Sequence, residues 1–560
     1  MEPLHALRRE LELATRPCRI KREGHDVGAF TPAALPLDLT TVRWDAIVIG
    51  SGIGGLACAA ALARTNKRVL VLEQQHALGG STNSFSRNGY TWDVGLHYLS
   101  DLGPGLDAAV PLAWLCDGPV DAFSFGTTYD YVHFPDGFEI AFDHPESALK
   151  RNLKERFPDS SAQIDTYFDA LKRASNALTA SFILRGLPAP LAPLYAALKR
   201  PEIARWCGIT VHEMLERTIG DPKLRAVLGA QWCDYGGIPS TASFGLHAKV
   251  TRSFFNGAFY PVGGGAVLCR RMTPVIERAG GRLLADSRVE EILLERGAAA
   301  GVRMSDGRIF RSSRVISDAG SLNTIGRLLP APLRETAWAR EILSFSPSHS
   351  AVIMHLGLEG DIAAQGATVH NHWFYETWDQ NANLWSDPFA PGDAPMMFVS
   401  FPTLHDPKHD AGPGNKHTAG IIVMASADAF VDVIERPNQA AFDEYRQRKS
   451  ELSRKLLAQF ARYFPRLAPL ISYHELSTPV TVASYSSAPR GAIYGIEPSP
   501  RRFLSPNLGP RTPIPGLYLA GQDVVTPGVF GALVGGMLAA GAIDPRVLAH
   551  LPVNAALGLS

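Results

Sequence analysis

The segment spanning residues 44–80 constrains the fold of this chain more than any other, because it contains every part of a βαβ unit in the right order. Residues 46–49 are apolar and rich in β-formers, which predicts a buried parallel strand, and the alanine-rich residues 56–63 predict a helix. Residues 69–72 predict the second strand. The turn between the first strand and the helix has the G-x-G-x-x-G spacing of a dinucleotide-binding unit, with Gly50, Gly52 and Gly55.

Each glycine of this turn has a physical task. Gly50 permits the tight turn, Gly52 lets the backbone approach a pyrophosphate, and Gly55 lets the helix pack closely on the strand. Gly54 lies in the same turn and is also predicted to contact the ligand, because the helix N-terminus offers unpaired N–H groups to phosphates. Glu73 ends the second strand, where a carboxylate can accept hydrogen bonds from ribose hydroxyls and would repel a 2′-phosphate.

A second glycine segment decides which dinucleotide is expected. Gly79, Gly80, Ser81 and Thr82 follow Glu73 too closely to start another crossover, so they are expected to bring backbone towards the same ligand. This arrangement resembles the FAD-binding flavoproteins of the phytoene desaturase and amine oxidase type rather than the NAD dehydrogenases. The resemblance implies FAD as the cofactor.

The C-terminal part carries the other half of the resemblance. A predicted turn and strand lead to Gly521 and Asp523, and residues 524–543 form an uncharged, glycine-rich run. In the family the closing strand and helix return to the flavin. The resemblance implies that Asp523 binds the ribityl chain and that the helix N-terminus, here Gly528 and Val529, faces the isoalloxazine.

Two apolar stretches raise the question of a membrane. The run at residues 524–543 is about as long as a membrane span, but its many glycines favour close packing against a cofactor and a sheet. Residues 182–198 are apolar, broken by prolines and followed by Lys199 and Arg200. This stretch suits either an interfacial segment beside anionic headgroups or a cover over the substrate pocket. The cover is favoured, and the two interpretations are compatible.

Composition excludes several classes of protein. The chain has 54 Lys and Arg against 54 Asp and Glu, so no nucleic-acid footprint is expected. Its six cysteines form no C-x-x-C pair and no metal-ligand spacing, which predicts a reducing compartment and no metal site. Charged residues interrupt any apolar core near the N-terminus, so no signal peptide is expected. The expected location is cytoplasmic, with peripheral contact at the inner membrane surface as the alternative.

The length of 560 residues is too great for one core and predicts two domains. An α/β FAD-binding domain of the Rossmann-like glutathione-reductase and amine-oxidase type is expected from three segments: residues 44–99, 260–327 and 508–560. Two segments that interrupt it, residues 100–259 and 328–507, are expected to form an α+β substrate domain, and residues 1–43 a leader. The family resemblance implies that the backbone at Val289 meets the adenine.

Three further motifs, at residues 93–98, 477–495 and 521–536, narrow the resemblance to the retinol saturase branch of the carotenoid desaturase, isomerase and saturase family. Members act on long polyenes with FAD as the redox centre, often at a membrane surface. The resemblance therefore implies an enzyme that saturates, desaturates or isomerises a carotenoid-like or retinoid-like isoprenoid. No second complete glycine fingerprint is visible, so the electron donor or acceptor is left open.

A saturase needs one proton besides the hydride that a flavin supplies. His97 is the predicted donor, because its motif follows Gly80 and histidine titrates near neutrality; the alternative is a structural histidine. Tyr485 is the second catalytic candidate. Tyr98, Tyr485 and Tyr494 can each line the pocket or donate a hydroxyl proton, and packing is the favoured interpretation.

Two other classes remain open. A flavin amine oxidase of the same fold is expected to need an aromatic cage and often a covalent cysteine near the last flavin motif, but residues 521–536 contain no cysteine. A non-enzymatic protein that binds prenylated proteins, resembling the Rab escort proteins, would not need the phosphate and flavin motifs that stand at both ends of this chain.

Overall fold

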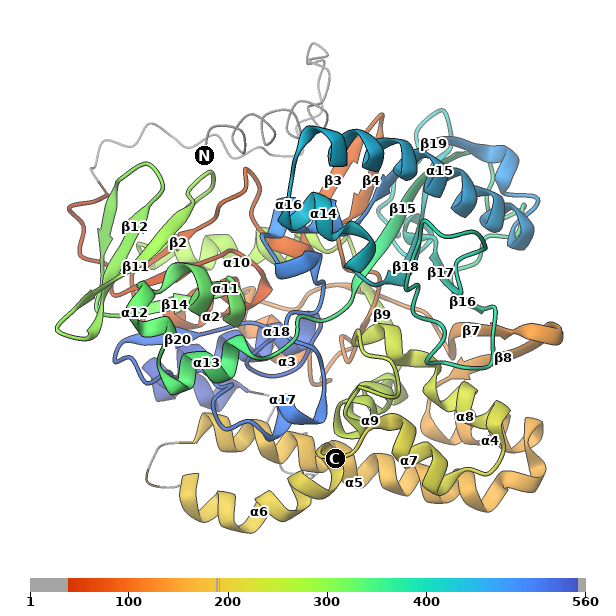
Figure 1. The fold of residues 1–560 in the computed structure, drawn as a ribbon, viewed down its shortest axis with the longest axis horizontal. Coiled ribbons are helices and arrows are strands. Elements are labelled where there is room, and N and C mark those ends of the chain that lie inside the picture. The colour runs from red at the N-terminus through yellow and green to blue at the C-terminus, as the bar shows by residue number, and fades with distance from the viewer. Residues whose placement is uncertain (1–38, 188–189, 191, 552–560) are drawn as a thin grey trace.

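The structure, a computed structural model, describes residues 39–187, 190 and 192–551 (Figure 1). Most of the predicted leader, residues 1–43, therefore lies outside the described residues. One core is a five-stranded parallel sheet in the order β10–β2–β1–β14–β20. Its strands are β1 (Ala46–Ile49), β2 (Val69–Leu72), β10 (Arg282–Leu284), β14 (Val315–Ser317) and β20 (Leu517–Leu519).

Two helices built from small residues lie beside this sheet: the first packs on β1 and β2, and the second packs on the first. Helix α2 (Ile53–Arg64) follows the glycine turn, and α18 (Val529–Ile543) packs against α2. A Cβ added at Gly536 of α18 would lie 2.0 Å from the carbonyl oxygen of Gly54, so only glycine allows this approach. Of the apolar run at residues 524–543, residues 529–543 thus form a largely buried helix. Within the described residues no helix is both long and apolar enough to cross a membrane.

A second sheet has seven strands in the order β19–β15–β18–β17–β16–β7–β8. All its pairings are antiparallel except that of β16 with β7. Its strands are β7 (Thr128–Phe134), β8 (Phe138–Asp143), β15 (Ser350–Glu359), β16 (Asn371–Tyr375), β17 (Met396–Ser400), β18 (Lys416–Ala425) and β19 (Ile471–Ser477). In Figure 1 it stands beside the parallel sheet.

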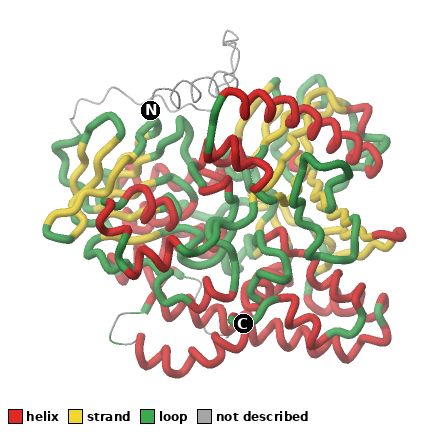
Figure 2. The backbone as a smooth tube through the Cα atoms, viewed as in Figure 1, coloured by secondary structure: helices red, strands yellow, loops and turns green. Residues whose placement is uncertain are grey.

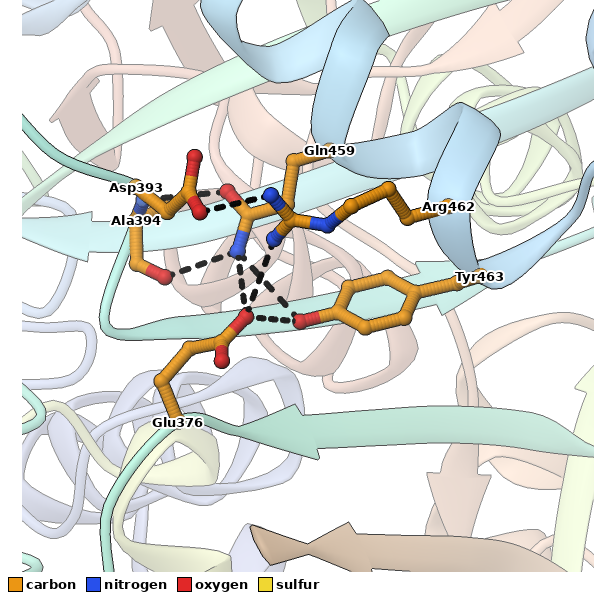
Figure 3. A network of polar contacts seen from close by, with 6 residues as sticks. All are labelled: Glu376, Asp393, Ala394, Gln459, Arg462 and Tyr463. Carbon is orange, nitrogen blue, oxygen red and sulfur yellow. Dashed lines mark hydrogen bonds and ion pairs between the residues drawn. The ribbon is translucent and has the colours of Figure 1, made fainter.

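The long helix α15 (Gln439–Tyr463) packs on the seven-stranded sheet and is anchored by a polar network near its C-terminus (Figure 3). The fully buried amide of Gln459 accepts a hydrogen bond from the Ala394 N–H and donates one to the Ala394 carbonyl, each 2.9 Å long. Arg462 pairs with Asp393 at 2.7 Å, and the Tyr463 hydroxyl donates to Glu376. The network fixes the helix on the connection between β16 and β17.

A helical layer lies below both sheets in Figure 1, and Figure 2 shows the same layer in red. It contains α4 (Glu146–Arg156), α5 (Ser161–Gly186), α6 (Ala192–Cys207), α7 (Val211–Thr218), α8 (Pro222–Gly229) and α9 (Phe244–Ser253). Arg185 of α5 donates to the carbonyl of Val524 at 2.6 Å, which ties this layer to the loop before α18. His247 of α9 is buried between the hydroxyls of Tyr167 and Tyr235, and so is a structural histidine.

Shorter elements join these layers. The strands are β3 (Ser84–Arg87), β4 (Tyr90–Asp93), β5 (Leu99–Ser100), β6 (Ala122–Ser124), β9 (Ala258–Pro261), β11 (Val289–Glu295), β12 (Ala298–Met304) and β13 (Ile309–Arg311). The helices are α3 (Ala109–Leu115), α10 (Ala266–Arg278), α11 (Ser321–Asn323), α12 (Ala331–Arg334), α13 (Ala337–Leu343), α14 (Val431–Glu435), α16 (Pro479–Ser486) and α17 (Pro500–Leu504). Strands β11 to β13 form a three-stranded antiparallel sheet after α10.

The distribution of strands bears on the predicted domains. The parallel sheet takes strands from all three segments assigned to the FAD domain, and the seven-stranded sheet takes strands from both segments assigned to the substrate domain. Strand β9 crosses the predicted boundary at residue 260 and pairs with β5 and β6, so a small sheet joins the two parts. The division into two interleaved domains remains our proposal.

Candidate active site

A cavity of about 1500 Å³ lies where the parallel sheet, the seven-stranded sheet and the helical layer meet. Its wall includes the glycine turn after β1, the end of β2, the start of β11, the N-terminus of α18 and the facing sides of α5 and α9. Ligand sites for one drug-sized molecule usually measure ~300–1000 Å³. The cavity therefore has room for a dinucleotide and a second ligand.

The glycine turn forms one end of the cavity. Gly50, Gly52 and Gly54 line the wall, whereas Gly55 lies behind it. The φ angle of Gly50 is 94°, and a Cβ at Gly55 would lie 2.2 Å from the Gly50 carbonyl oxygen. Backbone at a helix N-terminus is therefore presented to the cavity, an arrangement suited to a phosphate group.

Glu73 is almost fully buried beside this turn. Its Oε2 accepts hydrogen bonds from the N–H and the hydroxyl of Ser51 at 2.9 and 2.7 Å, and its Oε1 accepts from the N–H of Gln75 at 2.9 Å. A ribose would use the remaining lone pairs of the same carboxylate. Ser51, which the sequence analysis did not single out, therefore fixes Glu73 against the glycine turn.

The second glycine segment lies against the first. The N–H of Gly79 donates to Ser51 Oγ at 3.1 Å, and a Cβ at Gly80 would lie 3.0 Å from the Gly52 Cα. Gly80, Ser81 and Thr82 line the cavity, whereas Gly79 does not. Residues 79–82 and the first turn thus face the same end of the cavity.

The other predicted cofactor residues lie along the same wall. Val289 begins β11 and lines the cavity. Asp523 also lines it, and its two carboxylate oxygens accept hydrogen bonds from the N–H groups of Ser321 at 2.7 Å and Ile496 at 2.9 Å. Gly528, with a φ of 91°, caps α18, and Val529 follows on the wall. Gly521 lies behind the wall, with a φ of 84°.

Asp318 is a site residue that the sequence analysis missed. It follows β14, and its Oδ2 accepts a hydrogen bond from the N–H of Gly55 at 2.8 Å. Its carboxyl also lies 2.7 Å from the point that a Cβ would occupy at Gly52. Burial raises its pKa to about 7, with smaller contributions from the charges of Glu73 and Asp523. The sequence signal that could have identified Asp318 is its position directly after β14, because the carboxyl ends of parallel strands meet at one edge of a sheet.

The two catalytic candidates lie in different surroundings. His97 lines the cavity, and its buried Nδ1 has no hydrogen-bond partner. Burial lowers the pKa of His97 to about 4, so the imidazole is neutral at pH 7. Tyr485 is the penultimate residue of α16 and has 41% of its surface exposed. Its carbonyl accepts hydrogen bonds from the side chains of Gln74 and Gln75. Tyr485 therefore stands beside the segment that follows Glu73.

In the part of the chain that the structure describes, no three His, Cys, Asp or Glu side chains are grouped as metal ligands. Residues 182–187, at the start of the apolar stretch with two interpretations, form the end of α5, where Phe182 and Ile183 line the cavity. The later part, in α6, includes the strongly exposed Leu194 and Leu198.

Comparison with known proteins agrees with this arrangement. The model of the family "Flavin containing amine oxidoreductase" matches residues 53–544. All-trans-retinol 13,14-reductase of Rattus norvegicus is 31% identical over 540 residues, which cover 93% of this chain and 88% of that protein. The chloroplastic prolycopene isomerase of Arabidopsis thaliana is 25% identical, over 93% of this chain and 86% of its own length.

Solved structures show the same fold at low identity. Putrescine oxidase bound to putrescine has a TM-score of 0.60 and 16% identity, over 90% of this chain and all of its own. An oxidoreductase from Methanosarcina mazei has a TM-score of 0.58 and 17% identity, over 88% of this chain and 98% of its own. The predicted fold class and family resemblance are therefore confirmed. The chain belongs to the flavin-containing amine oxidoreductase family, in the retinol saturase branch, and is an enzyme.

Proposed function

We propose that this protein is an FAD-dependent oxidoreductase that acts on carbon–carbon double or single bonds of a long apolar polyene of the retinoid or carotenoid type. The observation that carries the proposal is the shape of one cavity, which runs from the glycine turn into a chamber lined by both sheets and the helical layer. The names of the relatives, retinol reductases and prolycopene isomerases, support the same substrate class.

The nucleotide end fits FAD. The backbone of the two glycine segments, Glu73 and Val289 would hold the adenosine diphosphate part, and Asp523 and the N-terminus of α18 the riboflavin part. When bound, the flavin gives or takes a hydride at a carbon atom. The part of the protein is to position the polyene against it and to keep water out.

The far part of the chamber suits an apolar chain. Its wall is mainly aliphatic and aromatic, with Phe182, Ile183, Val250, Phe254, Ile353, Trp373, Met396, Phe398, Ile422, Met424 and Leu538. Burying such a ligand is favourable by about 25 cal/mol per Å² of apolar surface. His97 lies in this wall against Phe398, with ring centroids 5.8 Å apart, and is our predicted contact for the reacting carbons.

We further propose that α6 brings the protein to a membrane surface. Leu194 and Leu198 are 69% and 68% exposed, and the exposed Lys199 and Arg200 follow them. Apolar side chains beside cations suit the interface of an anionic bilayer. Because α6 packs on α5, which lines the chamber with Phe182 and Ile183, a lipid substrate would enter there. The proposed location is the inner surface of the cytoplasmic membrane.

Anaerobic half-reactions test the function. The cofactor is released by denaturation of the purified protein and identified by chromatography, and FAD is expected. The reduced holoprotein is then mixed in turn with retinol, a longer carotenoid and an isoprenoid lipid, while the flavin absorbance is recorded. Reoxidation by at least one polyene is expected for a saturase, and reduction of the oxidised protein by a saturated partner for a desaturase. If only amines reduce the oxidised protein, the proposal is wrong and the amine oxidase alternative holds.

A further inference from the structure

Two carboxyl groups surround the hydroxyl of Tyr98 in the wall of the chamber. Tyr98 Oη lies 3.1 Å from Asp130 Oδ2, and 3.1 and 3.2 Å from the two oxygens of Asp234. Asp130 belongs to β7 and Asp234 ends the short helix formed by residues 230–234. Among the described residues, no cation contributes to the electrostatics of either carboxyl.

The number of protons shared by Tyr98, Asp130 and Asp234 follows from their geometry. A tyrosine hydroxyl can donate one hydrogen bond, yet three carboxyl oxygens lie within reach of it. Two ionised carboxylates without a cation would repel each other strongly at such a buried position. One carboxyl must therefore hold a proton, donating it to the Tyr98 oxygen while the Tyr98 hydroxyl donates to the other.

The electrostatics agree with that count. Burial raises the pKa of Asp130 to about 7, against the lowering effect of hydrogen bonds from Asn371 and Tyr98. Burial also raises the pKa of Asp234 well above its usual range, and the charge of Asp130 raises it further. The two carboxyls titrate as a pair. The other ionisable groups that interact electrostatically with these residues and their neighbours are Tyr129, Cys233, Asp143, Tyr235, Tyr375 and Tyr494.

The group is open to the chamber on one side only. Tyr98 and Asp234 line the cavity, whereas Asp130 is fully buried behind them. Asn371 donates to Asp130 at 3.0 Å, but its own amide oxygen is buried without a partner, as is the hydroxyl of Tyr129. Buried polar atoms of this kind normally have a partner. Both atoms therefore keep hydrogen-bonding capacity beside the two carboxyls.

We propose that Asp234, Tyr98 and Asp130 form the proton-delivery group of the polyene reaction. This inference rests on the proposed function. Asp234 is the catalytic residue that gives a proton to one carbon of the double bond, while the other carbon receives a hydride from the reduced flavin. The π bond is replaced by two C–H bonds, the polyene is reduced and the flavin is oxidised. Tyr98 meanwhile donates its hydrogen bond to the ionised Asp130, and solvent that enters the chamber returns a proton to Asp234, which lines the cavity, after the step.

His97 is a weaker donor for the same step. A neutral imidazole gives up a proton far less readily than a carboxylic acid, and burial keeps His97 neutral at pH 7. Desaturation would use the same group in reverse, with Asp234 ionised and accepting the proton. In both directions the proton is exchanged with a carboxyl in the chamber wall, so the transfer itself needs no open path to bulk water.

An infrared measurement on the resting holoprotein tests, without any substrate, whether Asp130 and Asp234 share a proton. At pH 7 the wild-type protein is expected to show the C=O stretch of protonated carboxyls, and the Asp130→Asn/Asp234→Asn variant is expected to lose the intensity of one carboxyl, while Asp318, whose pKa burial raises to about 7, keeps a band of its own. The matched control is Glu475→Gln, which removes another carboxyl of the cavity wall and should leave the band in place. Tyr98→Phe should shift the band, because it removes a hydrogen bond. No band in the wild type, or a band of undiminished intensity in the double variant, would overturn the proposal.

A kinetic measurement tests delivery to carbon. With the polyene that reoxidises the flavin, Asp234→Asn and Tyr98→Phe should slow reoxidation by about 10²–10⁴-fold, the scale for loss of a positioned acid. In D₂O the wild type should place one deuterium in the product and show a solvent isotope effect on this step. Normal flavin content and circular dichroism verify folding, with Tyr98→Phe serving if Asp234→Asn does not fold. If His97→Gln slows the step and Asp234→Asn does not, the proton comes from His97. If no polyene reoxidises the wild type, the proposed function fails while the infrared result stands.

Discussion

Replacing Asp318 by asparagine should make FAD binding independent of pH. The carboxyl of Asp318 lies at the N-terminus of α2, 2.8 Å from the N–H of Gly55, where the glycine turn is predicted to receive the pyrophosphate. An ionised carboxylate there would compete with the cofactor. Two unit charges 4 Å apart repel by about 4 kcal/mol at an effective dielectric constant of ~20. FAD should therefore bind the form of the protein in which Asp318 is protonated.

The size of the effect follows from the pKa of Asp318, which burial raises to about 7. If only the protonated form is competent, the apparent Kd equals the intrinsic Kd divided by the protonated fraction. At pH 6 nearly all of the protein is competent, and at pH 8 only about one tenth is. The wild-type protein should thus bind FAD about tenfold more weakly at pH 8 than at pH 6, and Asp318→Asn should bind equally at both.

Stability of the apoprotein should follow the same group. The folded state holds a proton on Asp318 up to about pH 7, whereas the ordinary pKa is 3.8. The folded state therefore binds more protons than the unfolded state between these values, and stability falls as pH rises through this window. The loss amounts to about 4 kcal/mol at most. Asp318→Asn should remove it, offset by about 1 kcal/mol for a weakened hydrogen bond to Gly55.

Titration of apoprotein with FAD at pH 6 and pH 8, together with urea unfolding at both, provides the assay. Glu290→Gln is the matched control, because Glu290 is an exposed carboxyl on the wall of the same cavity. It should behave as the wild type. Equal pH dependence in wild type and Asp318→Asn would refute the argument, since the titrating group would then lie elsewhere.

Four further outcomes are expected. Gly52→Val should place a side chain against Asp318 and yield colourless protein, and normal flavin content would contradict the assignment. Ser51→Ala removes two bonds to Glu73 and Gly79 and should weaken FAD binding by about 1–3 kcal/mol, measured by titration. Arg502→Met leaves the carbonyls of Ile496 and Gln522 without the hydrogen bonds that this buried guanidinium donates. It should lower the free energy of unfolding, measured in urea, by about 2–4 kcal/mol. Leu194→Ser/Leu198→Ser should reduce co-sedimentation with anionic vesicles, while vesicle binding at wild-type level would exclude α6 as the contact.

The parts of the fold that could be predicted from sequence are the local ones. Strands β1 and β2 and the helix between them follow from short-range patterns, so their bounds agree with the sequence to within a few residues. Asp318 could not be assigned in this way, because it reaches the glycine turn only through the parallel pairing of β14 with β1. The same holds for Asp130 and Asp234, which meet Tyr98 from separate elements.

His97 shows a second limit of prediction from sequence. Its motif identified a histidine near the flavin motifs, but not the burial that keeps it neutral. Charge state depends on the groups that surround a side chain, and for His97 these come from β17 and β18 as well as from its own segment. Residue type therefore indicated acid–base chemistry without indicating which group holds the proton.

The contact between α2 and α18 has a consequence for synthesis of the chain. Helix α2 leaves the ribosome well before the helix that packs on it, because more than 460 residues separate Arg64 from Val529. At ~5–20 residues per second, the interval is on the order of a minute. Throughout it, the apolar surface of α2 that α18 later covers lacks its native partner in the growing chain. A chain truncated before α18 would lack the helix that packs on α2 and so could not reach the folded state, even though it contains the whole glycine turn at residues 50–55.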